Sequence, residues 1–184
     1  MRSFLPPLQE TQEDLESYQD ASKRLRSLIP EPILEEKLSQ YECELEEDFL
    51  GFLEPYDAVS RFLPKEFAVV DFGCYMAPQA FYFQSHRRYI GVDAYDLAAS
   101  PRLLRFETPN SLMISGTIQE TVGWFSPSVY AICSAVPDKK AVDLVRQRFP
   151  NHCITYPSQK EDISGVQAEK IRSFLQRNGR THRR

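Results

Sequence analysis

Five short apolar runs, separated by segments of helical character, dominate the chain from residue 67 onward. They occupy residues 67–73, 88–95, 111–116, 128–136 and 152–157. Runs of this length, rich in Val, Ile and aromatic residues, are typical of strands that are buried on both faces of a parallel sheet. Helices are expected at 78–85, 117–124 and 138–149, and another after the fifth run. The alternation predicts an α/β fold for residues 65–184, with an open, mostly parallel sheet of about five strands and helices on both faces.

Residues 1–64 have a different pattern and are expected to form a helical region that packs on the sheet domain. Apolar residues recur at helical spacing in 11–28 and 33–50, and a short third helix is expected at 55–62. One apolar stripe of the second helix should be buried, against the sheet domain or a second copy of the chain: Leu34, Leu38, Leu45 and Phe49. Residues 10–54 hold 14 acidic and four basic residues. These acidic helices are a candidate surface for a homodimer or a protein partner.

Composition and cysteine spacing narrow the class of protein. Hydrophobic residues make up 42% and charged residues 26% of the 184-residue chain, which excludes a mainly disordered protein. No apolar run approaches the roughly 20 residues of a membrane-spanning helix, and the N-terminus lacks the pattern of a secretory signal. The four cysteines are far apart and form no CxxC pair. We therefore expect a cytoplasmic protein without disulfides, metal or membrane partner.

Two acidic residues mark the ends of the first two predicted strands. Asp71 precedes Gly73 at the end of the first strand, and Asp93 ends the second, 20 residues after that glycine. Ligands of open α/β sheets bind at the carboxyl ends of the strands. An acid about 20 residues beyond the glycine turn is the spacing at which nucleotide-binding folds hold a ribose. The sequence therefore predicts a nucleotide site at this edge of the sheet.

Over about residues 67–157 the chain resembles the class I, Rossmann-like, S-adenosylmethionine-dependent methyltransferases. In that family the first strand runs into an acid-x-Gly-x-Gly-x-Gly turn. Asp71 and Gly73 match this turn, whereas Tyr75 and Ala77 replace further glycines. The resemblance implies that S-adenosylmethionine is the cofactor and that a small molecule or a protein accepts the methyl group.

The resemblance also implies where the parts of the cofactor lie. Asp93 would bind the ribose, and Thr117 replaces the acid that usually meets the adenine amino group. The fourth strand ends where the family places catalytic or substrate-facing residues, but the sequence singles out no catalytic residue. The implied cofactor-binding set is Asp71, Gly73, Tyr75, Asp93, Ala94, Tyr95, Thr117, Ile118 and Ser134.

Departures from the family keep a second hypothesis open. No Asn-Pro-Pro-Tyr or Pro-Cys motif follows the fourth strand, so methylation of nucleic-acid bases is not expected. After the fifth run the chain has no room for the antiparallel hairpin that usually completes the sheet, so it would be a divergent, shortened version. The alternative is an inactive Rossmann-like module that binds or regulates a partner through its acidic helices. An NAD-dependent oxidoreductase would need a GxGxxG turn, and residues 73–78 read GCYMAP.

Several residues also have a structural interpretation. Asp71 could cap its turn by accepting backbone N–H bonds, and Asp93 could pair with Arg87 or Arg88. Other residues are assigned to structural positions: His86 to a solvated loop, and Cys74, Cys133, Phe81, Tyr82, Phe83, Trp124 and Phe125 to the core.

Overall fold

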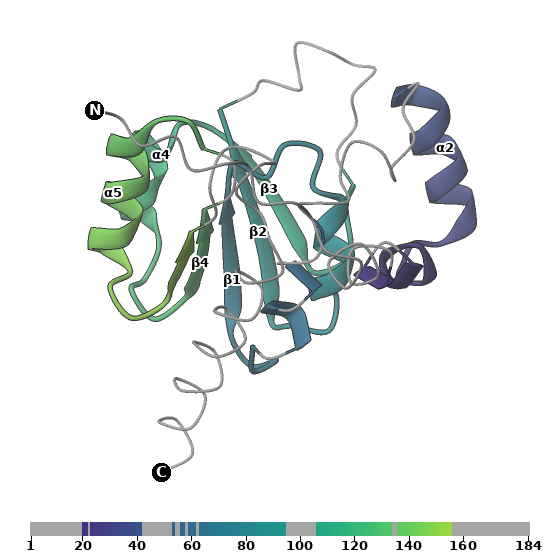
Figure 1. Cartoon of the computed structure of the whole chain (residues 1–184), viewed down its shortest axis with the longest axis horizontal. Coiled ribbons are helices and arrows are strands. Elements are labelled where there is room, and N and C mark those ends of the chain that lie inside the picture. Colours follow the sequence, from purple (N-terminus) through teal and green to yellow (C-terminus); the bar gives the residue numbers. More distant parts are fainter. Residues whose placement is uncertain are drawn as a thin grey trace, which may run out of the picture.

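The computed structural model contains a five-stranded sheet in which every neighbouring pair of strands is parallel (Figure 1). It describes residues 20–21, 23–41, 53, 56–57, 59–61, 63–94, 106–133 and 136–155. The strands are β1 (Ala68–Phe72), β2 (Arg88–Asp93), β3 (Ser111–Ser115), β4 (Tyr130–Cys133) and β5 (Cys153–Thr155). Their order in the sheet is β3-β2-β1-β4-β5. The chain adds β2 and β3 on one side of β1 and then β4 and β5 on the other. This is the Rossmann-like α/β fold that the sequence predicts.

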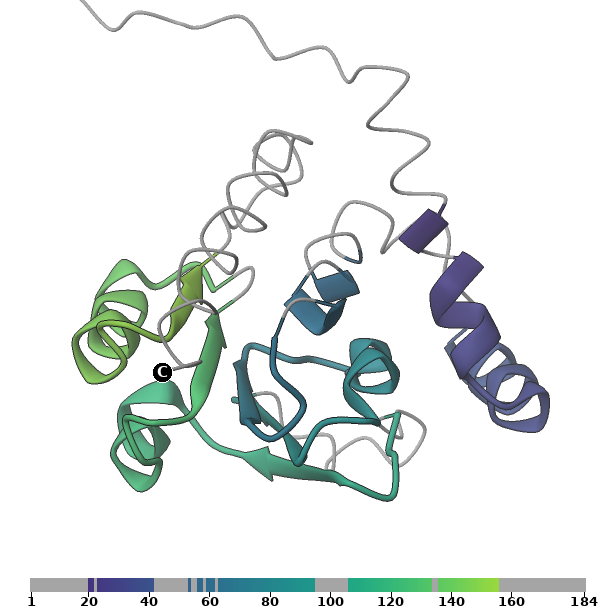
Figure 2. The ribbon, with the colours of Figure 1, turned by 90° about the horizontal axis from the view of Figure 1, so that it is seen from below.

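Alternating residues of the strands build two hydrophobic layers. Val70 and Phe72 of β1 face α4 (Ile118–Thr121) and α5 (Lys139–Arg148), with which they share one buried cluster. Val69 faces the opposite side, where η1 (Pro78–Phe83) and the N-terminal helical residues pack. Figure 2 shows α4 and α5 on one side of the sheet and η1 and α2 on the other. The central strand is therefore apolar in nearly every position because both of its faces are covered.

The N-terminal helical region shares its core with the sheet. Residues 23–28 are helical, and α2 (Glu31–Tyr41) follows after Pro30. Leu25, Leu34 and Leu53 are buried in the same cluster as residues of β1, β2 and β4. Leu34 is thus buried as predicted, while Leu45, Phe49 and the side chain of Leu38 lie outside the described residues. The last predicted helix also lies outside them.

A polar cluster joins these helical segments to the sheet domain. The Arg24 guanidinium forms an ion pair with Asp57 and donates a hydrogen bond of 2.9 Å to Ser60. Arg61 Nε donates to the second Asp57 oxygen at 2.9 Å. The Arg24 guanidinium also lies 5.2 Å from the ring centroid of Tyr82 in η1. Arg24 thus links Asp57 and Ser60 to η1.

Two predictions about single residues are wrong. Trp124 is 67% exposed, because the short helix η3 (Val122–Trp124) ends there and Phe125 takes the inward position, 5.8 Å from Phe72 between ring centroids. His86 is buried rather than solvated, because the turn after η1 brings its ring within 5.1 Å of the Phe83 ring.

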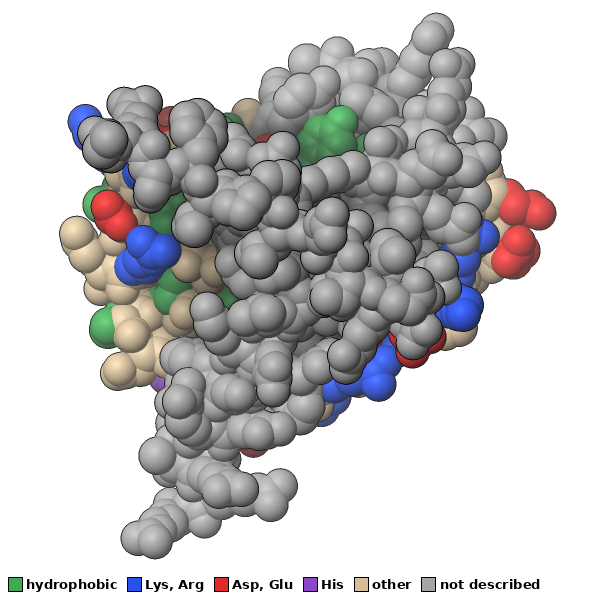
Figure 3. All heavy atoms as spheres, in the orientation of Figure 1, with side chains coloured by type: hydrophobic (Ala, Val, Ile, Leu, Met, Phe, Trp, Pro, Cys, Tyr) green, Lys and Arg blue, Asp and Glu red, His purple; other side chains and the backbone are tan. Residues whose placement is uncertain are grey.

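The visible surface shows mixed charge. In Figure 3 the edge formed by α5 carries basic and acidic side chains side by side, and both also occur at the opposite edge, near α2. On α5, Asp143 and Arg146 form an exposed pair at 3.4 Å. Among the residues that the structure describes, none forms a helix with the length and apolar character needed to cross a membrane.

Candidate functional site

A cavity of about 510 Å³ opens at the carboxyl ends of the strands, where the sequence predicts a nucleotide site. Six of the nine predicted residues line it: Gly73, Tyr75, Asp93, Ala94, Thr117 and Ile118. They come from three strand ends that parallel topology places at one edge of the sheet. Tyr95 and Ser134 lie outside the described residues, and Asp71 lies beneath the cavity rather than on its wall.

The turn after β1 is tightly wound. Gly73, Tyr75 and Ala77 all have positive φ angles, of 83°, 48° and 60°. The Gly73 and Cys74 N–H groups both donate to the Val92 carbonyl, at 2.8 and 3.3 Å. A left-handed conformation costs a non-glycine residue about 1–2 kcal/mol. The turn therefore keeps the shape that glycines usually provide, at a cost in strain at two of its positions.

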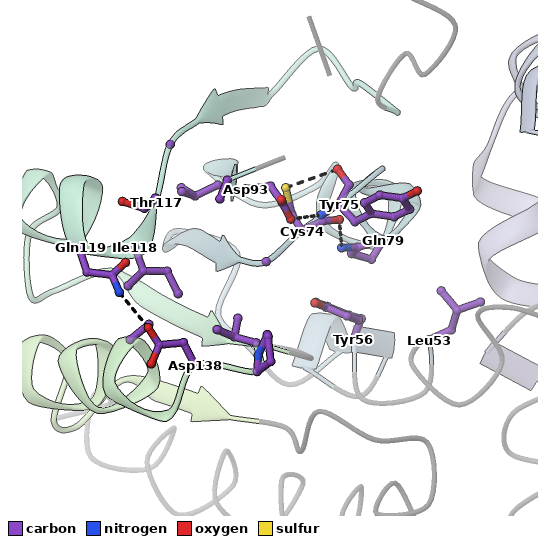
Figure 4. Close-up of a pocket in the computed structure, with 17 residues that line it drawn as sticks. Leu53, Tyr56, Cys74, Tyr75, Gln79, Asp93, Thr117, Ile118, Gln119 and Asp138 are labelled. Atoms are coloured by element: carbon purple, nitrogen blue, oxygen red, sulfur yellow. Dashed lines mark hydrogen bonds between the residues drawn. The ribbon is translucent and has the colours of Figure 1, made fainter. Parts of the chain in front are cut away.

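Asp93 stands where this turn meets β2. It is the last residue of the strand, and its Oδ2 accepts the Tyr75 N–H at 2.8 Å (Figure 4). The structural alternative, a pair with Arg87 or Arg88, is wrong. Arg88 begins the same strand five residues earlier, about 16 Å away at 3.3 Å per residue, and Arg87 is one residue farther. Asp93 is instead a partly buried carboxylate on the wall of the cavity.

Asp71 occupies a buried polar network under the cavity. Its carboxylate accepts hydrogen bonds from Tyr56 Oη at 3.0 Å, Gln79 Nε2 at 2.9 Å and Tyr89 Oη at 2.5 Å. Burial raises the pKa of Asp71 to about 6, although all three hydrogen bonds act in the opposite direction. The donors are side chains rather than the backbone N–H groups expected from the sequence. Since Tyr56 and Gln79 also line the cavity, Asp71 holds part of its wall in place.

The opposite end of the cavity is formed by the loops after β3 and β4. Thr117 caps α4: its hydroxyl accepts the Glu120 N–H at 3.3 Å and donates to Glu120 Oε2 at 2.7 Å. Gln119 Nε2 donates to Asp138 Oδ2 at 3.0 Å. Figure 4 shows Gln119, Ile118 and Asp138 at this end, far from Tyr56. The hydroxyl of Thr117 is thus engaged in the helix cap.

The predicted set does not include several lining residues, among them Leu53, Tyr56, Gln119 and Asp138. Leu53 and Tyr56 come from the N-terminal region, and no sequence motif predicts that they line a cavity at the strand ends. Asp138 did carry a signal, since an acid before an amphipathic helix is a typical N-cap, and its Oδ1 accepts the Lys140 N–H at 2.9 Å. Gln119 follows the predicted Thr117 and Ile118 in the first turn of α4.

The electrostatic character of the cavity is acidic. Its described lining contains the carboxylates of Asp93 and Asp138 but no Lys, Arg or His. Within the described part of the chain, no group of three or more His, Cys, Asp or Glu side chains is arranged to hold a metal ion. Cys74, which lines the cavity, and Cys133 are both buried, as predicted. Burial raises the pKa of the Cys133 thiol to about 12, so this group is protonated at neutral pH.

Comparison with known proteins adds no assignment to this geometry. No protein-family model, curated protein or solved structure matches the chain.

Proposed function

We propose that the cavity binds S-adenosylmethionine and that the protein is a cytoplasmic methyltransferase acting on a small molecule or a protein. The observation that carries the proposal is the position of Asp93, at the end of β2 and on the wall of a cavity at the carboxyl edge of a parallel sheet. A carboxylate there accepts hydrogen bonds from the two hydroxyls of a ribose. A carboxylate offers about four acceptor positions, so it can accept from the Tyr75 N–H and from a ribose together.

The charge of the cavity favours a sulfonium nucleoside over a dinucleotide. Proteins bind phosphate groups with Arg, Lys and clustered N–H groups at helix N-termini. The described lining has two carboxylates and no basic side chain. Such a site repels a pyrophosphate and attracts a ligand that carries a sulfonium and an ammonium group. This lining opposes an NAD-dependent oxidoreductase, independently of the missing GxGxxG turn.

The shape of the cavity also suits a nucleoside. Its volume of about 510 Å³ lies within the usual range for small-molecule sites, about 300–1,000 Å³. The side chains of Ile118, Val136 and Ala141 also line the cavity and provide apolar surface on which a flat base can pack. A ribose on Asp93 and a base on this apolar surface would use both the polar and the apolar parts of the lining.

In this proposal the protein acts mainly by orientation. When bound, S-adenosylmethionine supplies an electrophilic methyl group on its sulfonium sulfur. Asp93 would fix the ribose, and the turn containing Tyr75 would hold the adjoining part of the cavity in shape. Holding a methyl group in line with an acceptor at close range can account for a large share of a rate enhancement. An acceptor that is already nucleophilic needs no general base.

A second candidate function is an inactive module that binds the nucleoside or only a protein partner. The observation that favours it is the strained turn, in which Tyr75 and Ala77 occupy left-handed positions. Methyl transfer and binding separate the two candidates. Calorimetry that finds binding, together with no transfer of labelled methyl groups to metabolite or protein extracts, would favour the binding module.

The direct test is calorimetric titration with S-adenosylhomocysteine, S-adenosylmethionine and NAD. We expect the first two to bind and NAD not to bind. Asp93→Asn keeps the shape of the side chain but removes its charge, so affinity should fall about 10- to 100-fold. Its free energy of unfolding should change little, because the Asn oxygen can still accept the Tyr75 N–H. Asp143→Asn, an exposed change on α5, is the matched control and should leave affinity unchanged. No binding of either adenosyl compound at millimolar concentration would refute the proposal.

A further inference from the structure

We propose that Gln119 selects the base of the ligand by accepting a hydrogen bond from the exocyclic amino group of adenine, and that Asp138 sets the orientation of Gln119. This inference rests on the proposed function, because it requires an adenosyl ligand in the cavity. It assigns base recognition to a residue that the sequence motif does not include.

The first step is the orientation of the Gln119 amide. Gln119 lines the cavity, and its Nε2 donates to Asp138 Oδ2 at 3.0 Å. An ionised carboxylate only accepts hydrogen bonds, so the amide must turn its NH₂ group toward Asp138. The carbonyl oxygen, on the other side of the same planar group, then faces away from Asp138. No donor among the described residues contacts that oxygen, which leaves it available to a ligand amino group.

The second step places the base beside Gln119. The Gly116 N–H donates to the Asp93 carbonyl at 2.9 Å, so the chain leaving β3 lies directly alongside the end of β2. On the β1 side of Asp93, the Tyr75 N–H donates a hydrogen bond to the carboxylate at 2.8 Å. The apolar surface of Ile118 lies on the β3 side, together with Gln119 (Figure 4). A ribose held by Asp93 therefore directs its base toward Ile118 and Gln119.

Thr117 is a weaker candidate for this contact than Gln119. Thr117 is the position that the sequence motif associates with the adenine amino group, but its hydroxyl donates to Glu120 Oε2 at 2.7 Å. Its backbone N–H also donates to Glu120 Oε2, at 2.8 Å. The hydroxyl oxygen also accepts the Glu120 N–H at 3.3 Å, which leaves one lone pair whose direction is set by the cap of α4. Gln119 can accept the same hydrogen bond without losing a protein contact.

Asp138 provides a way to reverse the preference. Its Oδ1 caps α5 by accepting the Lys140 N–H at 2.9 Å. Asp138→Asn should keep this cap, because Asn is as good an N-cap as Asp. With the Asn oxygen held by the cap, its NH₂ group takes the place of Oδ2 and faces Gln119. The Gln119 amide then rotates to accept that bond, and its own NH₂ group faces the base.

The experiment compares two ligands that differ at position 6 of the base and in the proton that the inosyl compound carries on N1. S-adenosylhomocysteine carries an amino group at position 6, and S-inosylhomocysteine carries an oxygen. By calorimetry, the unaltered protein should bind the adenosyl compound about tenfold more tightly, the scale of one net hydrogen bond of about 1.4 kcal/mol. Gln119→Met removes the amide at similar length, so the two affinities should agree within about twofold. Asp138→Asn should favour the inosyl compound.

Gln147→Met, an exposed change on α5 outside the cavity, is the control and should keep the tenfold preference. The inference is overturned if the adenosyl compound binds and Gln119→Met retains the preference of the unaltered protein. It is also overturned if Asp138→Asn keeps the adenosyl preference while its melting temperature shows an intact fold. If neither compound binds the unaltered protein, the proposed function fails and base selection fails with it.

Discussion

Two buried titratable groups should make opposite contributions to the pH dependence of stability. Asp71 has its pKa raised from 3.8 to about 6, chiefly because burial disfavours the charged carboxylate. His86 has its pKa lowered from 6.5 to about 4, chiefly because burial disfavours the imidazolium, with Lys65 adding to the effect. Between pH 4 and pH 6 the native state thus protonates Asp71 more readily than the unfolded chain does, and His86 less readily.

The sign of each contribution follows from this difference. For Asp71, the native state binds more protons than the unfolded state, so stability falls as pH rises from about 3.8 to 6. For His86, the unfolded state binds more protons, so stability rises with pH from about 4 to 6.5. At about 1.4 kcal/mol per pKa unit, each contribution amounts to about 3 kcal/mol. In the unaltered protein the two should nearly cancel.

Single substitutions should reveal how each group makes the free energy of unfolding depend on pH. Asp71→Asn keeps the shape and lets a tyrosine hydroxyl turn to accept, so the remaining His86 effect should lower the free energy of unfolding by about 3 kcal/mol from pH 7 to pH 4, relative to the unaltered protein. His86→Phe keeps an aromatic ring against Phe83 and should show the opposite relative change. Urea denaturation at pH 4, 5, 6 and 7 measures both. If the Asp71→Asn curve runs parallel to that of the unaltered protein, the assignment of a raised pKa to Asp71 is wrong.

Two further substitutions test the capping and the packing described above. Thr117→Ala should lower the free energy of unfolding by about 1 kcal/mol through loss of the α4 cap, and Thr117→Ser should restore it. Both variants should bind S-adenosylhomocysteine with the affinity of the unaltered protein; a marked loss of affinity in Thr117→Ala alone would instead show that the hydroxyl contacts the ligand. Gly91→Ala places a methyl group 2.7 Å from Met113 Sδ and 2.8 Å from Cys74 Sγ, so thermal denaturation should show a loss of about 1–3 kcal/mol; an unchanged melting temperature would mean that both sulfur atoms move aside freely.

The sheet could be predicted because its strands obey a simple rule. A central parallel strand is covered on both faces, so Val69, Val70 and Phe72 form one continuous apolar run that sequence alone reveals. The exact ends are less visible, since apolar residues continue past the paired backbone. Residues 128–136 read as one strand, whereas β4 covers Tyr130–Cys133 in the described part of the chain, and Val136 lines the cavity.

Exposure of a single aromatic residue follows from tertiary packing, which local pattern does not encode. Trp124 and Phe125 are adjacent and equally apolar, yet only Phe125 reaches the core, beside Phe72. The contribution of Leu53 and Tyr56 to the cavity was hidden for the same reason. Both belong to the buried cluster that contains Val69 and Tyr89 of the sheet, and the Tyr56 hydroxyl donates to Asp71 at 3.0 Å.

The two strand-end acids, Asp71 and Asp93, show what the spacing rule predicts and what it does not. Asp71 lies inside β1, and because side chains alternate across a strand, it must face away from its neighbours Val70 and Phe72. That direction leads to the layer containing Tyr56 and Tyr89, where the carboxylate is fully buried. Asp93 is the last residue of β2 and lines the cavity. The interval of 20 residues between Gly73 and Asp93 identifies the edge of the sheet. Both carboxylates face the same side of the sheet, because Asp71 pairs with Gly91, two residues before Asp93. The position of Asp93 at the strand end places it on the cavity wall, while Asp71 supports that wall from behind.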